Sequence, residues 1–129
     1  MACPRAAAGT FGLILFVALA SAQAQGPAPR KKSVAETRLE LIATPGTVTK
    51  QQQDGWFVVE DRANRAVWSF VPNNHDAYPA VVKRSVVTRA DGNYIDMDVI
   101  CEAPKAACDR LVEDFKALNA ETIKGLQKR

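Results

Sequence analysis

The chain has 129 residues, of which 47% are hydrophobic and 24% charged, with 17 basic side chains, 14 acidic side chains and three cysteines. This length suits one small domain. The acidic and basic side chains nearly balance, and the sequence has no concentration of basic residues of the kind that binding to a phosphate backbone needs. We therefore expect no nucleic-acid partner.

Residues 1–24 are typical of a secretory signal peptide. Arg5 precedes the apolar run Phe11–Ala20, and Ala22-Gln23-Ala24 has small residues where a signal peptidase reads the chain. A membrane span needs about 20 apolar residues, roughly twice this run, so we expect cleavage after Ala24, or alternatively after Ala22, and no stable span afterwards. The mature protein is expected in the periplasm or outside the cell.

Cleavage leaves residues 25–129, and the loss of Arg5 leaves 16 basic and 14 acidic side chains, a net charge of +2. Residues 25–33 hold two prolines and the basic triplet Arg30-Lys31-Lys32, and we predict a disordered lead-in there. Residues 34–129 are predicted to form a single small domain.

The first part of that domain has no single interpretation. Ser33 and Glu36 have the spacing of a capping box, and the apolar residues that follow fit a short helix ending before Thr44-Pro45-Gly46. The same residues also alternate as a strand would, and we favour a short helix or an irregular segment. Residues 47–52 are polar and suit either an edge strand or a loop.

A first β-hairpin is predicted from two β-rich runs, residues 56–59 and 66–71, on either side of a polar stretch. A three-residue loop with Asp61 opposite Arg65 is the expected register. It places three aromatic side chains on one face of the sheet. We assign them to the core rather than to a binding surface: Trp56, Trp68 and Phe70.

A second hairpin joins residues 80–89 to residues 93–101 and has two open registers. A two-residue turn at Asp91-Gly92 places Arg84 opposite Val99 on the core face. A three-residue loop places Arg84 opposite Asp98 instead. We prefer the second register because it pairs the guanidinium with a carboxylate, and charged groups are rarely buried unpaired.

The C-terminal segment is predicted to be an amphipathic helix that begins around Pro104. Cys101 shares its side of the last strand with Met97 and Val99. Cys108 lies on the expected buried stripe of the helix, in register with Leu111, Val112, Phe115, Leu118 and Thr122.

Both cysteines therefore point into one core, and Cys3 leaves with the signal peptide. A Cys101–Cys108 disulfide is the preferred interpretation for an exported chain. Two free thiols remain an alternative, whereas a metal site is disfavoured because His75 is the only histidine. The predicted class is α+β: an antiparallel sheet of about four strands in two hairpins, with the C-terminal helix packed on one face and one disulfide.

The chain contains no HExxH, GxSxG or phosphate-binding glycine loop, and we assign no catalytic residue, metal or cofactor. The best candidate for recognition is the loop Pro72–Pro79 with its flanks, because binding groups often lie on loops of a rigid sheet. Its candidate residues are Asn73, Asn74, His75, Asp76, Tyr78, Lys83 and Arg84.

The run Val67–Arg84, followed by Cys101 and by Ala106-Ala107-Cys108-Asp109, resembles a pattern in small uncharacterised secreted proteins of proteobacteria. The resemblance covers roughly residues 56–119. It implies a periplasmic location and the pairing of the two cysteines, and no activity comes with it.

The first hypothesis for function is a small exported protein that acts by binding another envelope protein or a small ligand. A second hypothesis is a hydrolase or lyase that uses His75 with Asp76 or Tyr78. A third is a structural envelope component that stacks through exposed Trp56 or Trp68. The sequence gives no indication of the oligomeric state.

Overall fold

The computed structural model describes residue 26 and residues 28–128, and the chain separates into the units Met1–Arg30 and Lys31–Arg129. The predicted signal peptide, residues 1–24, lies outside the described residues. Within the lead-in, the described residues form neither helix nor strand. The helices and strands of the described residues all lie in the unit Lys31–Arg129.

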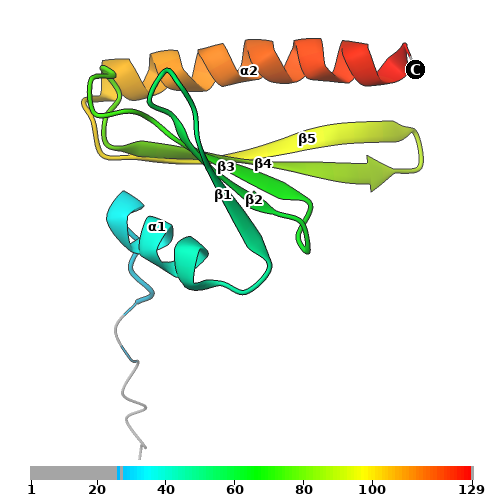
Figure 1. Ribbon diagram of the computed structural model, residues 1–129. Coiled ribbons are helices and arrows are strands. Elements are labelled where there is room, and N and C mark those ends of the chain that lie inside the picture. Colours follow the sequence, from blue (N-terminus) through cyan, green and yellow to red (C-terminus); the bar gives the residue numbers. More distant parts are fainter. Residues whose placement is uncertain (1–25, 27, 129) are drawn as a thin grey trace, which may run out of the picture. The chain divides into compact units, whose positions relative to one another are not determined.

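Five antiparallel strands form one sheet, in which each strand pairs with the next along the chain (Figure 1). In this order each strand runs back beside the one before it, so neighbouring strands are joined by turns and loops and no crossover is needed. The α+β class is therefore confirmed, with five strands instead of about four, because the polar segment after the first helix forms an edge strand. The elements are α1 (Val34–Ala43), β1 (Thr47–Gln51), β2 (Phe57–Asp61), β3 (Ala66–Phe70), β4 (Ala80–Arg89), β5 (Gly92–Cys101) and α2 (Lys105–Gln127).

The two helices lie on opposite faces of the sheet, here called the α1 face and the α2 face (Figure 1). Side chains alternate along a strand, so Val81 enters the core under α1 while Val82 enters the core under α2. The prediction of one helix on one face is thus incomplete, because α1 covers the second face. The α1 core contains Val34, Leu41, Val59, Phe70 and Val81, and the α2 core contains Val71, Ala77, Ala80, Val82, Ala107, Leu111 and Phe115.

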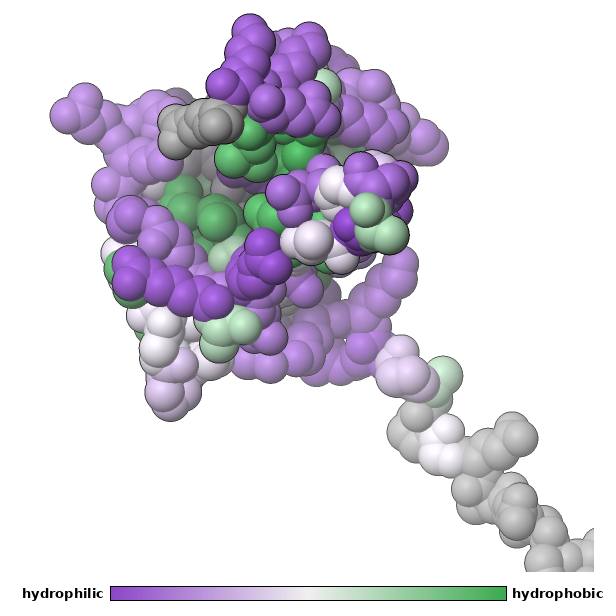
Figure 2. All heavy atoms as spheres, turned by 90° about the vertical axis from the view of Figure 1, so that its right-hand side faces the viewer, coloured by the Kyte–Doolittle hydropathy of each residue, from purple (hydrophilic) through white to green (hydrophobic). Residues whose placement is uncertain are grey.

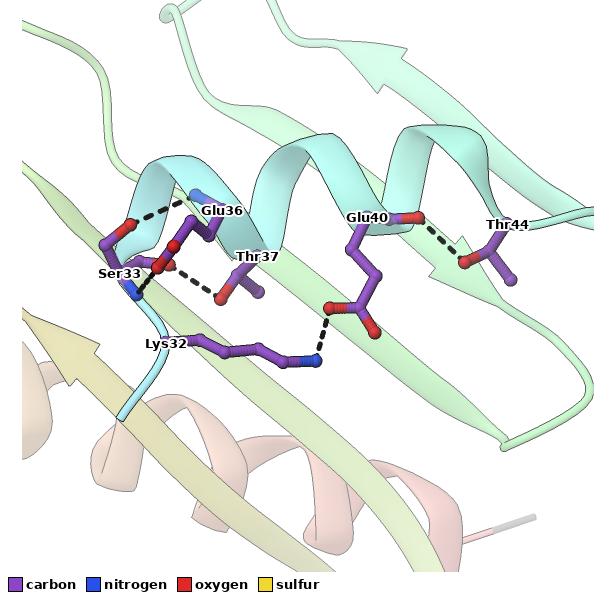
Figure 3. A network of polar contacts seen from close by, with 6 residues as sticks. All are labelled: Lys32, Ser33, Glu36, Thr37, Glu40 and Thr44. Atoms are coloured by element: carbon purple, nitrogen blue, oxygen red, sulfur yellow. Dashed lines mark hydrogen bonds and ion pairs between the residues drawn. The ribbon is translucent and has the colours of Figure 1, made fainter. Parts of the chain in front are cut away.

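Helix α1 is fixed at both ends by its own polar side chains (Figure 3). The Ser33 hydroxyl accepts a hydrogen bond from the Glu36 N–H at 3.1 Å, and the Glu36 carboxylate accepts one from the Ser33 N–H at 2.9 Å. At the other end the Thr44 hydroxyl donates to the Glu40 carbonyl at 2.8 Å, and Lys32 forms an ion pair with the Glu40 carboxylate. This is the predicted capping box, and the helical interpretation of the segment is the correct one.

Helix α2 begins directly after Pro104 and is joined to the end of β5 by the Cys101–Cys108 disulfide, with a Cα–Cα distance of 5.9 Å. The predicted cysteine pairing is confirmed. The predicted buried stripe is correct only for the first half of the helix. Leu111 is 1% exposed, whereas Leu118 is 46% exposed and Thr122 also lies at the surface.

The predicted register of the first hairpin is wrong by one residue. Asp61 pairs with Ala66, so the loop spans the four residues 62–65, and Arg65 takes the left-handed conformation at φ 51°. The cause is the Asp61 carboxylate, which accepts hydrogen bonds from the Asn64 N–H at 3.2 Å and from the Asn64 side chain at 2.7 Å. As a result Trp56 packs with the α2 core, apart from Trp68 and Phe70, which pack with the α1 core.

The second hairpin takes neither of its two predicted registers. Arg89 pairs with Gly92, so that Arg84 lies opposite Met97 and Lys83 lies opposite Asp98. This register places a lysine opposite the Asp98 carboxylate and leaves the arginine on the α2 face. The assumption that an arginine avoids this face fails because the guanidinium lies over the Phe115 ring, 5.4 Å from its centroid.

Candidate functional site

The loop Pro72–Pro79 is held by bonds within itself. The His75 N–H donates to the Pro72 carbonyl at 3.0 Å, the Tyr78 N–H donates to the His75 carbonyl at 2.9 Å, and the Tyr78–Pro79 peptide bond is cis. Ala77, which is fully buried, anchors the loop in the α2 core. Asn73, Asn74, Asp76 and Tyr78 lie at the surface, whereas His75 is partly buried.

The side chain of His75 makes contacts that stabilise the loop. Its Nδ1 accepts a hydrogen bond from the Ala77 N–H at 3.0 Å, and its ring meets Trp56 edge-on at a centroid distance of 5.6 Å. The Asp76 carboxylate lies 3.6 Å from the Arg110 guanidinium. Among the described residues no hydrogen bond joins the His75 side chain to Asp76 or Tyr78, so neither carboxylate nor phenol orients the imidazole as a catalytic base requires.

Lys83 and Arg84 do not join the loop residues in one site. They are adjacent in β4 and therefore point to opposite faces of the sheet. The Lys83 ammonium lies over the Trp68 ring at 5.2 Å on the α1 face, while Arg84 lies on the α2 face over Phe115. The predicted set of candidate residues is thus divided among three places.

Two pockets border the loop, and most of the residues that line them are polar or charged. One, of about 620 Å³, includes Asn73, Asn74 and Tyr78 with residues of the β1–β2 connection. The other, of about 540 Å³, includes His75 and Asp76 with charged residues of α2. The second pocket also has an apolar part, to which Ala107 and Leu111 contribute.

A different hollow lies on the α2 face, between α2 and the side of the sheet formed by β1, β2 and β3. Strands in a sheet lie about 4.8 Å apart, so five of them span roughly 19 Å, whereas a packed helix covers about 10 Å. Because α2 packs mainly against β5, a hollow is left between the helix and this part of the sheet. Figure 2 views the molecule from the C-terminal end of α2 and shows hydrophobic atoms gathered in a hollow beneath that helix, with polar atoms around it.

We call this hollow the apolar groove. Its volume is about 490 Å³, and it is open to solvent on one side. Val58, Val67 and Ser69 of the sheet form its floor, and Trp56, Phe115 and Leu118 form its walls. Of these six, Val58, Ser69 and Phe115 are buried, and Leu118 is exposed.

Trp56 is held in the groove wall by a close approach of two loops. The preceding Gly55 has φ 89° and lies against Pro72, and a Cβ atom at residue 55 would lie only 3.0 Å from the Pro72 Cβ. Only glycine fits such a position without strain. The Trp56 ring then packs on Phe115 at a centroid distance of 5.8 Å, which fixes one wall of the groove against α2.

Charged side chains line the same groove. Lys50 pairs with Glu60 across β1 and β2, and the Arg62 guanidinium lies 3.6 Å from the other Glu60 oxygen. The hydrogen bond from Lys50 is the main cause of the lowered pKa of Glu60. Asp54 and Asp114 lie at the exposed mouth, and Arg84 lies where the sheet meets α2.

The described residues contain no group of three or more His, Cys, Asp or Glu side chains placed to hold a metal ion. Within residue 26 and residues 28–128, no helix combines the length and apolar character that crossing a bilayer requires.

Comparison with known proteins does not assign the chain to a family. No family model matches the chain, and the searches of curated proteins and of solved structures return no match either. Function therefore has to be inferred from the geometry.

The groove was not predicted from the sequence, although one signal for it exists. The apolar stripe of the C-terminal helix continues through Leu118 beyond the residues that one strand pair can bury. If five strands had been counted and Trp56 had been placed on the α2 face, that face would have had more apolar side chains than one helix can cover. This would have indicated an open surface.

Proposed function

We propose that this chain is a small exported, non-enzymatic binding or accessory protein of the cell envelope, and that it holds an apolar segment of another polypeptide in the apolar groove. The proposal depends chiefly on one observation: a hollow of about 490 Å³ lies between α2 and the β1–β3 side of the sheet, and apolar side chains, among them Trp56, Val67 and Leu118, line part of it. Apolar side chains grouped in a surface hollow are one mark of an interaction site.

The openness of the groove favours a polypeptide over a small ligand. Pockets for small molecules usually enclose 70–90% of the ligand surface. The apolar groove has a floor and two walls but remains open along one side, so it can accept side chains from a larger partner. Helices and extended segments bind grooves of this type through a few apolar anchors.

Two features support the exported part of this proposal. A predicted signal peptide precedes the domain, and the Cys101–Cys108 disulfide suits an oxidising compartment. An envelope partner is therefore the expected one.

Helix α2 supplies a matched pair of variants to test the groove. Leu118 and Leu126 are each 46% exposed on the same helix, but only Leu118 lines the groove. With the exported protein as bait in an envelope extract from its cells of origin, we expect Leu118→Asp to reduce capture of the specific partner about 10-fold or more, because an apolar anchor is replaced by a charge. We expect Leu126→Asp to leave capture unchanged.

Circular dichroism and thermal melting would establish that both variants fold. Equal capture by the wild type and Leu118→Asp, or equal loss in the two variants, would contradict binding through the groove.

A further inference from the structure

Arg84 is a charged residue in the apolar groove, and its presence there is not explained by a contribution to the stability of the fold. It lies on the α2 face of β4 with its guanidinium over the Phe115 ring at 5.4 Å. Its Nε is fully buried and has no hydrogen-bond partner, and the side chain forms no ion pair with any residue that the structure describes. Burial lowers the pKa of Arg84, but a guanidinium stays charged at all physiological pH values.

The arginine carries a cost for the isolated domain, because its Nε is buried without a hydrogen bond and the guanidinium is partly removed from water. Taking a cation partly out of water loses hydration, and the contact with an aromatic face restores only part of it. An apolar side chain of similar length would fill the same space without that loss. A counter-charge supplied by a bound partner would account for the arginine.

The other charges around the groove do not supply this counter-charge. Glu60 is already neutralised by Lys50 and Arg62. Asp114 and Asp54 lie at the mouth, where both are exposed and screened by water and salt. Among the charged side chains that line the groove, Arg84 is therefore the partly buried one without an ion pair.

We propose that the segment held in the apolar groove carries a carboxylate beside large apolar side chains, and that this carboxylate pairs with Arg84. This inference rests on the proposed function and adds the chemistry of the partner. The apolar side chains pack on Trp56 and Leu118, and the acidic side chain reaches the junction of the sheet and α2. An arginine suits this role because its planar fork can bind both carboxylate oxygens at once.

The test uses peptides selected from a phage-displayed library of random 12-residue sequences on the immobilised wild-type protein. We expect the selected peptides to combine Asp or Glu with large apolar residues. Changing that acid to its amide should weaken binding to the wild type about 10-fold or more, as for a partly buried charge pair. On Arg84→Met the same change should alter affinity less than about 2-fold, because the partner charge is gone.

Lys83→Met is the matched control. Lys83 is the neighbouring cation in β4, but it faces α1, so its loss should leave peptide affinity unchanged. Arg84→Met should fold at least as well as the wild type, because it removes a half-buried unpaired charge and keeps the apolar stem.

Several results would overturn the inference. One is a selection that returns no binding peptide, or peptides without a shared acid. Others are an equal effect of the amide change on the wild type and Arg84→Met, and an equal loss of affinity in Lys83→Met. Displacement of the peptides by dodecanoate at micromolar concentration would assign the site to a fatty acid instead. If selected peptides bind through Leu118 without coupling to Arg84, the carboxylate preference is wrong while the proposed function stands; if their binding ignores Leu118, the proposed function fails as well.

Discussion

Replacing Leu111 with alanine is expected to lower the free energy of unfolding by about 3 kcal/mol. Leu111 is only 1% exposed and is one of the largest fully buried side chains, packed between α2 and the sheet with Ala77 and Val82. Truncation removes its apolar contacts and leaves a cavity. The disulfide tethers α2 to β5, so the helix cannot shift to close that cavity. Urea unfolding followed by far-ultraviolet circular dichroism measures the loss.

The control for this prediction is Leu118→Ala, the same substitution two turns further along α2. Because Leu118 is 46% exposed, we expect a loss below about 1 kcal/mol. Equal losses at the two positions would mean that α2 does not pack on the sheet through Leu111, and the α2 core would have to be placed elsewhere.

Removing the Cys101–Cys108 disulfide is expected to cost about 2.5 kcal/mol of unfolding free energy. The bond joins residues seven positions apart, and the chain-entropy model gives about this value for a loop of that size. The double variant Cys101→Ala with Cys108→Ala, compared with the wild type by urea unfolding, measures the effect. A domain of this size has little stability to spare, so the loss should also lower the melting temperature by roughly 10 °C or more.

Mass spectrometry provides the chemical control for the disulfide. The folded, unreduced protein should resist thiol alkylation at both cysteines, and reduction should add two hydrogens. Ready alkylation without reductant, or a double variant as stable as the wild type, would contradict the pairing and its role.

Local patterns in the sequence were sufficient for several elements. The capping box at Ser33 and Glu36 depends on residues three apart, and the structure has both of its hydrogen bonds. The disulfide followed from the alternation along β5 and the helical spacing around Cys108, two short-range patterns that meet at Pro104. The class and the C-terminal helix were predicted for the same reason.

Strand registers and the faces they define could not be predicted in the same way. A shift of one residue moves every side chain to the other face, so one unforeseen hydrogen bond has a large effect. The bonds between Asn64 and Asp61 lengthen the first loop and send Trp56 to the α2 face. In the second hairpin, the contact of Arg84 with Phe115 joins residues far apart in the chain, and no local pattern reports it.

The apolar groove could not be predicted for the same physical reason. The loop Pro72–Pro79 is rich in polar residues, but several of its polar groups are used within the loop or against α2. The apolar groove arises only when five strands, one helix and the loop around Gly55 are assembled, because its floor and its walls come from different parts of the chain.

The claim that the apolar groove, and not the loop Pro72–Pro79, is the recognition surface can be tested by amide chemical-shift mapping during titration with a selected peptide. We expect the largest shifts at Val58, Val67 and Leu118, with the amides of Asn73 and Tyr78 little changed. Shifts confined to the loop, with the groove amides unmoved, would contradict the account.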